Sequence, residues 1–364
     1  MVCVNQNTFR QLISGHHTGA AAVGLRLLLR AVSLPYAAAV RGRNILYSGR
    51  LLRSISAAVP VISVGNITTG GTGKTPLVIW LCRYLESKQR RCAILTRGYK
   101  TDKARPSDEP ALLAKACGDT SVVVDSDRVA GAQKAESQYG AEILVLDDGF
   151  QHRRLKRDLN ILTLDATCPF GYGRILPAGL LREPLSALKR ADVIVLTRYD
   201  QVASRTTARL EEQLARLAPA VPIVKAVHRH THAVAAGAKT LPLDTLRDKR
   251  AFVFCGIGNP DAFVDHVRQS GMDIVGSRVY NDHHVYTQED IKDLILQAEA
   301  CGAEMLLCTQ KDWVKTALLK PDTTDMLLAY LAMELEFIEG LEVLQNRIDR
   351  VLEMGNGQKE TDRS

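Results

Sequence analysis

The chain has 364 residues, of which 24% are charged and 46% are hydrophobic, a composition that excludes collagen-like and intrinsically disordered proteins. Its net charge is +7, and the excess is confined to residues 1–60, which contain seven Arg and no acidic residue. We therefore expect this segment alone to engage an anionic surface. Nucleic-acid binding is not expected, because the basic residues lie in an apolar segment without interleaved aromatic side chains.

Residues 20–40 are mostly apolar, but Arg26, Arg30 and Pro35 interrupt them. They are therefore not expected to form a simple transmembrane helix, which needs about 20 predominantly apolar residues. Arg spaced among Leu and Ala favours an amphipathic helix that lies in a membrane interface. A helix packed in the protein core and an Arg-rich transit peptide remain open as alternatives.

From residue 59, short apolar runs alternate with helical stretches. Because these runs are apolar at consecutive positions, they indicate strands buried on both faces of a parallel sheet, hence an α/β fold. The predicted strands are 59–64, 92–96, 121–124, 143–146, 159–164, 193–196 and 223–227.

Residues 228–250 are polar and weakly periodic, which is typical of a linker or a loose connection. A second βα series follows, with strands at 251–255 and 305–308 and helices at 261–269 and 288–300, the latter capped by Thr287.

The sequence thus predicts an N-terminal membrane-facing helical segment over 1–58, a P-loop NTPase-like parallel sheet domain over 59–227 and a second, smaller α/β domain over 228–364. The eight Cys form no C-x-x-C pair, and several lie in apolar runs, so we expect buried thiols in a reducing compartment.

The strongest chemical signal is a glycine-rich loop between a predicted strand and a predicted helix, the context that a P-loop requires. Its glycines allow successive backbone N–H groups to point at a phosphate, Lys74 supplies a cation, and Thr75 offers a hydroxyl to Mg²⁺. The usual first glycine of the motif is Thr68 here. The predicted nucleotide-binding residues are Thr68, Thr69, Gly70, Gly71, Thr72, Gly73, Lys74 and Thr75.

Two acids, Asp147 and Asp148, end the buried strand at 143–146. Carboxylate oxygens suit the hard cation Mg²⁺, so either acid is a candidate to hold it directly or through water. An Asp-Gly turn that closes the strand is the structural alternative for Asp148.

Several further blocks give the chain a specific resemblance to the tetraacyldisaccharide 4′-kinase family, the lipid A 4′-kinases of Gram-negative bacteria. The blocks are PVISVGNITTGGTGKTP (60–76), TRGYK (96–100), SDEP (107–110), DDGFQHRRL (147–155), GRILPAGLLREP (173–184), FCGIGNPDAF (254–263), NDHHVYTQED (281–290) and TQKDWVK (309–315). Ser107 stands where the family commonly has Gly, and Gln310 where it commonly has Glu.

The resemblance implies a kinase that transfers the ATP γ-phosphate to the 4′-hydroxyl of a membrane-embedded tetraacylated glucosamine disaccharide 1-phosphate, a lipid A precursor, to give lipid IVA. It also implies two domains that close over the nucleotide, and a location at the cytoplasmic face of the bacterial inner membrane. No obligate protein partner is expected. The matched positions are Asp108 and His283 as the catalytic pair, Glu109, Asp147 and Asp148 as the acidic magnesium shell, and Arg128 and Arg182 as phosphate or substrate contacts.

Chemistry supports a base at such a site, because a sugar hydroxyl must lose its proton as its oxygen attacks phosphorus. A His from the other domain would orient the Asp108 carboxylate and carry the proton away. Helix-capping by Asp108 and a surface turn at 282–284 are equally compatible with the residues alone.

A second function remains open on the residues, a membrane-associated P-loop nucleotide switch without lipid phosphotransfer. The chain lacks the Asn-Lys-x-Asp signature of guanine-specific switches, and Thr309 to Asp312 resembles it only weakly.

Overall fold

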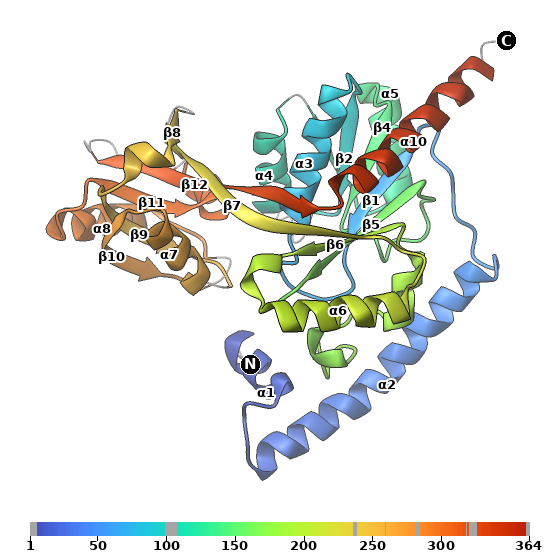
Figure 1. The fold of residues 1–364 in the computed structure, drawn as a ribbon, viewed down its shortest axis with the longest axis horizontal. Coiled ribbons are helices and arrows are strands. Elements are labelled where there is room, and N and C mark those ends of the chain that lie inside the picture. The colour runs from blue at the N-terminus through green and yellow to red at the C-terminus, as the bar shows by residue number, and fades with distance from the viewer. Residues whose placement is uncertain are drawn as a thin grey trace. The chain divides into compact units, whose positions relative to one another are not determined.

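The computed structural model describes residues 6–98, 108–118, 120–235, 239–258, 260–281, 284–317, 319 and 326–361. The chain forms two compact units (Figure 1). The first unit comprises Met1–Tyr99, Cys117–Val227 and Leu335–Ser364, and the second comprises Lys100–Ala116 and His228–Glu334. The three-segment division expected from the sequence stays a prediction.

The first unit is built on a parallel sheet in the order β6-β5-β1-β4-β2-β3, which confirms the expected architecture. Its strands are β1 (Val61–Gly65), β2 (Cys92–Thr96), β3 (Ser121–Val124), β4 (Ile143–Asp147), β5 (Leu159–Asp165) and β6 (Val193–Thr197). Every residue of β1, β2, β4 and β6 is buried. This burial explains why their sequences are apolar at consecutive positions.

Helices cover this sheet, and two further strands run through both units. The helices of the first unit are α1 (Gln6–Ser14), α2 (Ala20–Ser48), α3 (Lys74–Ser87), α5 (Arg128–Tyr139), α6 (Ser204–Leu217) and α10 (Leu341–Thr361). Strands β7 (Ile223–Ala235) and β12 (Leu327–Glu339) each have one end in either unit. In the first unit, α3 packs on β1 and β4, α5 on β2 and β3, and α6 contributes Leu210 and Leu214 to the core beside β5 and β6.

Helix α2 is the long blue helix in Figure 1, and it remains continuous through Pro35. Only Ala37 and Val40 among its residues are buried, which does not fit a helix packed in the protein core. Its apolar side chains are instead exposed, among them Leu28 at 59% and Leu34 at 70%. By length and composition alone, α2 is sufficient to cross a membrane, a test that soluble core helices and signal sequences also pass.

The second unit contains a smaller parallel sheet in the order β10-β9-β11-β12. Its own elements are β8 (Thr240–Pro242), β9 (Arg250–Cys255), β10 (Asp273–Val279) and β11 (Met305–Thr309) with helices α4 (Asp108–Ala116), α7 (Pro260–Gln269), α8 (Gln288–Ala300) and α9 (Gln310–Thr316). Helix α8 begins as predicted, because Thr287 and Asp290 form a capping box.

The prediction of a loose connection over 228–250 was wrong for part of that segment. Strand β7 continues to Ala235 and pairs antiparallel with β8. Ala233 and Ala235 are buried, whereas Val234 between them is only partly buried. This alternation is typical of a strand with one face in the core. Small and polar side chains carry this alternation, so an apolar pattern does not reveal it.

Candidate active site

The glycine-rich loop joins β1 to α3, as the sequence predicts. Gly73 has a left-handed backbone (φ 81°) immediately before Lys74, the first residue of α3. Gly70 also has a positive φ of 116°, which a residue with a side chain rarely adopts. The Thr69 N–H donates to the Leu180 carbonyl at 2.8 Å. Because the helix begins at Lys74, the N–H groups of its first turn have no intrahelical partner and are available, with those of the glycines, to bind an anion.

Hydrogen bonds that involve buried threonines hold this loop in place. Asn66 donates a hydrogen bond to the Thr72 hydroxyl (Nδ2 to Oγ1, 2.9 Å), and the hydroxyls of Thr72 and Thr163 are also 2.9 Å apart. The Thr197 hydroxyl donates to the Thr72 carbonyl at 3.0 Å. Both strands beside the loop on this flank, β5 and β6, therefore fix the loop backbone before any ligand enters.

Thr68, which replaces the first glycine of the motif, has a structural reason in this fold. It is 4% exposed and forms a β-bridge with Leu181. A Cβ placed on Gly171 would lie 3.1 Å from the Thr68 side chain, so the two segments are closely packed. Extended backbone at this position needs no glycine.

The two acids lie beside the loop, since β4 is the immediate neighbour of β1. Asp147 is paired in register with Val64, is 5% exposed, and accepts a hydrogen bond from the Thr96 hydroxyl at 3.4 Å. Asp148 follows with a positive φ of 52°. A Cβ on Gly149 would meet Leu146 at 2.5 Å, so the tight turn also depends on this glycine.

The Asp148 carboxylate forms ion pairs with two cations. Its carboxylate is 3.5 Å from the Lys74 ammonium (Oδ1 to Nζ) and 2.7 Å from the Arg182 guanidinium (Oδ2 to Nη1). Burial opposes ionisation of this carboxyl, but Lys74 and Arg182 outweigh it and lower the pKa of Asp148. The loop lysine, one predicted acid and one predicted arginine are thus brought together.

Arg128, the first residue of α5, lies near the same acids. It is 4% exposed, and its guanidinium donates to the carbonyl of Asp125. Burial lowers the pKa of Arg128, while the charges of Asp147 and Asp148 act in the opposite direction. A buried guanidinium facing two carboxylates fits the predicted phosphate contact in charge and position.

The predicted catalytic pair is described only in part. Asp108 and Glu109 begin α4, and the described part of that helix packs against α9 in the second unit, where Lys115 lies 5.5 Å from the centre of the Trp313 ring. The side chains of Asp108 and Glu109, and the whole of His283, lie outside the described residues. Their roles stay predictions. In the described ranges there is no group of three His, Cys, Asp or Glu side chains placed to hold a metal ion.

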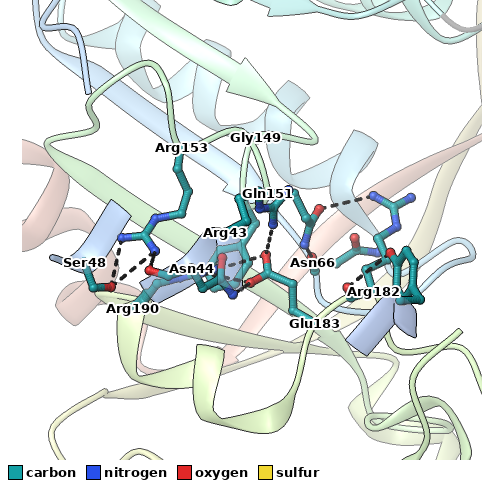
Figure 2. A network of polar contacts seen from close by, with 12 residues as sticks. Arg43, Asn44, Ser48, Asn66, Gly149, Gln151, Arg153, Arg182, Glu183 and Arg190 are labelled. Atoms are coloured by element: carbon teal, nitrogen blue, oxygen red, sulfur yellow. Dashed lines mark hydrogen bonds and ion pairs between the residues drawn. The ribbon is translucent and has the colours of Figure 1, made fainter. Parts of the chain in front are cut away.

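Sequence reasoning does not single out Glu183, whose contacts Figure 2 shows. This carboxylate is completely buried and accepts hydrogen bonds from Asn44 of α2 at 2.7 Å and from Arg190 at 2.9 Å. Arg43 of α2 lies 3.6 Å away, and Arg153 donates to the Asn44 carbonyl at 2.9 Å. We call Arg43, Asn44, Arg153, Glu183 and Arg190 the α2 junction. Glu183 and Arg153 lie more than 100 positions from the α2 residues that they contact, so no local pattern could indicate these contacts.

A short chain of contacts joins the α2 junction to the nucleotide loop. Arg182, next to Glu183, lies 3.4 Å from the Gln151 side-chain oxygen, and Gln151 donates to the Asn66 carbonyl at 2.7 Å (Figure 2). The Arg182 amide donates to the Ile67 carbonyl at 2.7 Å. Arg182 therefore contacts Ile67, just before the loop, through its backbone and Asp148 through its side chain, while the Glu183 side chain contacts α2.

Comparison with known proteins identifies the family of this fold and site. The family model described as tetraacyldisaccharide-1-P 4′-kinase matches residues 25–353. The chain belongs to this family. Tetraacyldisaccharide 4′-kinase from Geobacter metallireducens is 37% identical and is matched over 89% of this chain and 98% of its own. The enzyme of that name from Anaeromyxobacter sp. Fw109-5 is 36% identical, with 92% and 94% covered.

A solved structure agrees with these relatives. The crystal structure of LpxK from Aquifex aeolicus in complex with ATP superposes with a TM-score of 0.72 at 31% identity, covering 90% of this chain and 99% of that chain. The kinase fold expected from the resemblance is confirmed.

Proposed function

We propose that this 4′-kinase family member transfers the γ-phosphoryl group of ATP to the 4′-hydroxyl of a tetraacylated glucosamine disaccharide 1-phosphate, giving lipid IVA. The observation that carries the proposal is the cluster of Lys74, Asp148 and Arg182 at the end of the phosphate loop where α3 begins. Family membership favours this reaction over a nucleotide switch, because the matched relatives bear the name of the kinase.

The loop residues Thr68–Thr75 bind the triphosphate in this proposal. Backbone N–H groups of the loop and of the first turn of α3 donate to phosphate oxygens, and Lys74 exchanges its contact with Asp148 for one with the β- and γ-phosphates. Arg128 and Arg182 add guanidinium groups that match phosphate oxygens in shape and charge.

The residues present fit a magnesium ion. Asp148 Oδ1 is buried and makes no hydrogen bond, only the 3.5 Å ion pair with Lys74, and Asp147 and the Thr75 hydroxyl are further hard oxygen ligands at the ends of β4 and α3. We infer that these residues, with Glu109 from the start of α4, hold Mg²⁺. When bound, the ion neutralises negative charge on the transferring phosphate.

Asp108 is the proposed base. Its carboxylate would accept the proton of the 4′-hydroxyl as the sugar oxygen attacks the γ-phosphorus, and His283 would orient that carboxylate. This assignment rests on the match of both residues to the family's motifs, SDEP and NDHH.

The acceptor is a lipid, and α2 supplies a means of reaching it. Its exposed apolar side chains and the acid-free basic segment around them support attachment to an anionic membrane surface, which we place at the cytoplasmic face of the inner membrane. The helix would then hold the site beside the layer that contains the substrate.

Phosphate transfer is the direct test. Purified protein, γ-32P-labelled ATP, Mg²⁺ and the disaccharide 1-phosphate in mixed micelles should yield a labelled glycolipid. Hydrolysis of ATP at the same rate with and without acceptor, and no labelled lipid, would favour the nucleotide switch instead.

A further inference from the structure

Helix α1 precedes the region that the family model matches, yet it brings a basic side chain to the nucleotide loop. The guanidinium of Arg10 lies 3.5 Å (Nη2) from the position that a Cβ on Gly70 would occupy. We propose that Arg10 contacts the γ-phosphate of bound ATP and stabilises the charge on it during transfer to the lipid. This inference deepens the proposed kinase function and rests on it.

The position of Gly70 in the loop indicates what Arg10 could bind there. Gly70 lies within the stretch of loop whose N–H groups surround the β- and γ-phosphates of a nucleotide in a P-loop. A side chain at that position would approach the Arg10 guanidinium. An arginine beside this part of the loop occupies the region from which arginine fingers act on the γ-phosphate in other P-loop proteins, either from the same chain or from a partner.

The charge of the Arg10 guanidinium also acts on a second segment beside the loop. Burial raises the pKa of Tyr172, and the positive charge of Arg10 partly opposes that rise. The same charge acts on Cys168, whose pKa is also raised mainly by burial. Arg10 therefore lies where the segment 168–172 meets the nucleotide loop, and Gly171 in that segment packs on Thr68.

Among the described residues, Arg10 differs from the other cations around the loop, which are paired with carboxylates. Lys74 and Arg182 share Asp148, and Arg198 pairs with Asp165. For Arg10, by contrast, no ion pair or hydrogen bond of the side chain is found among the residues that the structure describes. A free guanidinium beside a phosphate loop is a ready partner for the phosphate oxygens, which its planar fork can bind in pairs.

Helix α1 is docked well enough to hold this side chain in place. Ile13 is 4% exposed, and α1 packs against α2. Arg26 of α2 donates to the carbonyl of His17 at 2.6 Å, which fixes the turn between the two helices. Arg10 is thus presented from an anchored helix, and less side-chain entropy is lost when it binds a phosphate.

The reaction step balances without a proton from Arg10. A bond forms between the sugar oxygen and the γ-phosphorus as the bond from that phosphorus to the β–γ bridging oxygen breaks, and the electron pair leaves with ADP. The hydroxyl proton goes to the proposed base Asp108. Arg10 stays protonated throughout and stabilises the equatorial oxygens as their charge is redistributed.

The test compares Arg10→Ala with Arg209→Ala, which removes one cation at an exposed position of α6 that has no part in the proposed nucleotide or membrane binding. At saturating ATP and lipid in mixed micelles, Arg10→Ala should lower kcat by about 100-fold to 1,000-fold, the usual loss for one transition-state donor. Arg10→Lys should recover part of that loss because it keeps the charge without the fork. Arg209→Ala should leave kcat within about twofold of the wild type, because it removes an exposed surface charge and no group at the loop.

Binding measurements separate a phosphate contact from a structural role. The affinity for Mg²⁺–ADP should be unchanged in Arg10→Ala, while the affinity for Mg²⁺–ADP–aluminium fluoride, which mimics the transferring phosphoryl group, should fall by about the same factor as kcat. Equal losses for ADP and ADP–aluminium fluoride, an unchanged kcat, or equal losses in the Arg10 and Arg209 variants would each overturn the proposal. A wild-type protein that binds the fluoride complex through Arg10 but labels no lipid would refute the proposed function alone.

Discussion

The α2 junction allows a quantitative prediction, because it buries a carboxylate completely. Glu183→Gln keeps the shape of the side chain and removes its charge, so Arg190 and Arg43 lose the only carboxylate that the structure places beside them in the described part of the chain. Breaking a fully buried ion pair costs about 3–5 kcal/mol. Because Arg190 and Arg43 keep 21% and 38% exposure, water compensates part of the loss, and we expect about 2–3 kcal/mol.

For a folding unit of this size, such a loss corresponds to a fall in Tm of about 5–10 °C. Trp80 of α3 stacks on Tyr84 and lies against Phe337, so its fluorescence reports on the first unit. The only other tryptophan, Trp313, lies in the second unit and is replaced by Phe in every variant of the experiment.

The matched control is Asp349→Asn, which removes a carboxylate of the same unit from a half-exposed ion pair with Lys88. It should cost less than about 1 kcal/mol, as exposed pairs do. Equal Tm values for the Glu183 and Asp349 variants would refute the reasoning, because burial of the carboxylate would then have no influence on the stability lost when its charge is removed.

Four further predictions concern the site, the membrane segment and the response to acid. Lys74→Ala should abolish labelling of the lipid, because it removes the cation that the loop directs at the phosphates; turnover near the wild-type rate would contradict the P-loop assignment. Asp108→Ala and His283→Ala should each lower kcat by about 10² to 10⁴ with nucleotide affinity little changed, and a loss of ATP binding alone would mean a structural role. Deletion of residues 1–40 should weaken sedimentation with anionic vesicles, whereas unchanged sedimentation would exclude α2 as the attachment. Burial, helped by His266, lowers the pKa of His230 from 6.5 to about 4, so the unfolded chain binds this proton first and the native state loses up to about 3 kcal/mol as pH falls from 6.5 to 4. His230→Gln should make the fall of Tm in that window smaller but not remove it, because burial also lowers the pKa of His152 to about 4; an unchanged fall would contradict this role of His230.

Much of the fold could be predicted because its signals are local. The strands at 92–96 and 121–124 and the helix after Thr287 have the expected bounds, since burial on both faces and capping chemistry act over a few residues. The meeting of Lys74 with Asp148 follows from the same source, because β1 and β4 are adjacent parallel strands that end at one edge.

The parts that sequence reasoning misses depend on contacts between distant segments. In its local sequence Glu183 resembles any surface glutamate. Only the fold shows that it is buried and that it accepts a hydrogen bond from Asn44, which lies 139 positions away in the chain. Arg10 is likewise one of seven arginines in an apolar segment until the fold places it beside Gly70. The extension of β7 was missed because its buried positions are His228, Ala233 and Ala235, not large or β-branched apolar residues.

Pro35 divides α2 into two parts with different surroundings. The part before it presents exposed side chains such as Leu28 and Leu34, whereas the part after it is held by Asn44 and by the Tyr36 hydroxyl, which donates to the Arg182 carbonyl at 3.4 Å. In the proposed membrane attachment the first part rests in the bilayer, and the contacts of the second part link it to the segment that carries Arg182. The thickness and curvature of the membrane would then determine the distance between the nucleotide site and the lipid headgroups. The choice of detergent or bilayer should therefore alter turnover even at constant acceptor concentration.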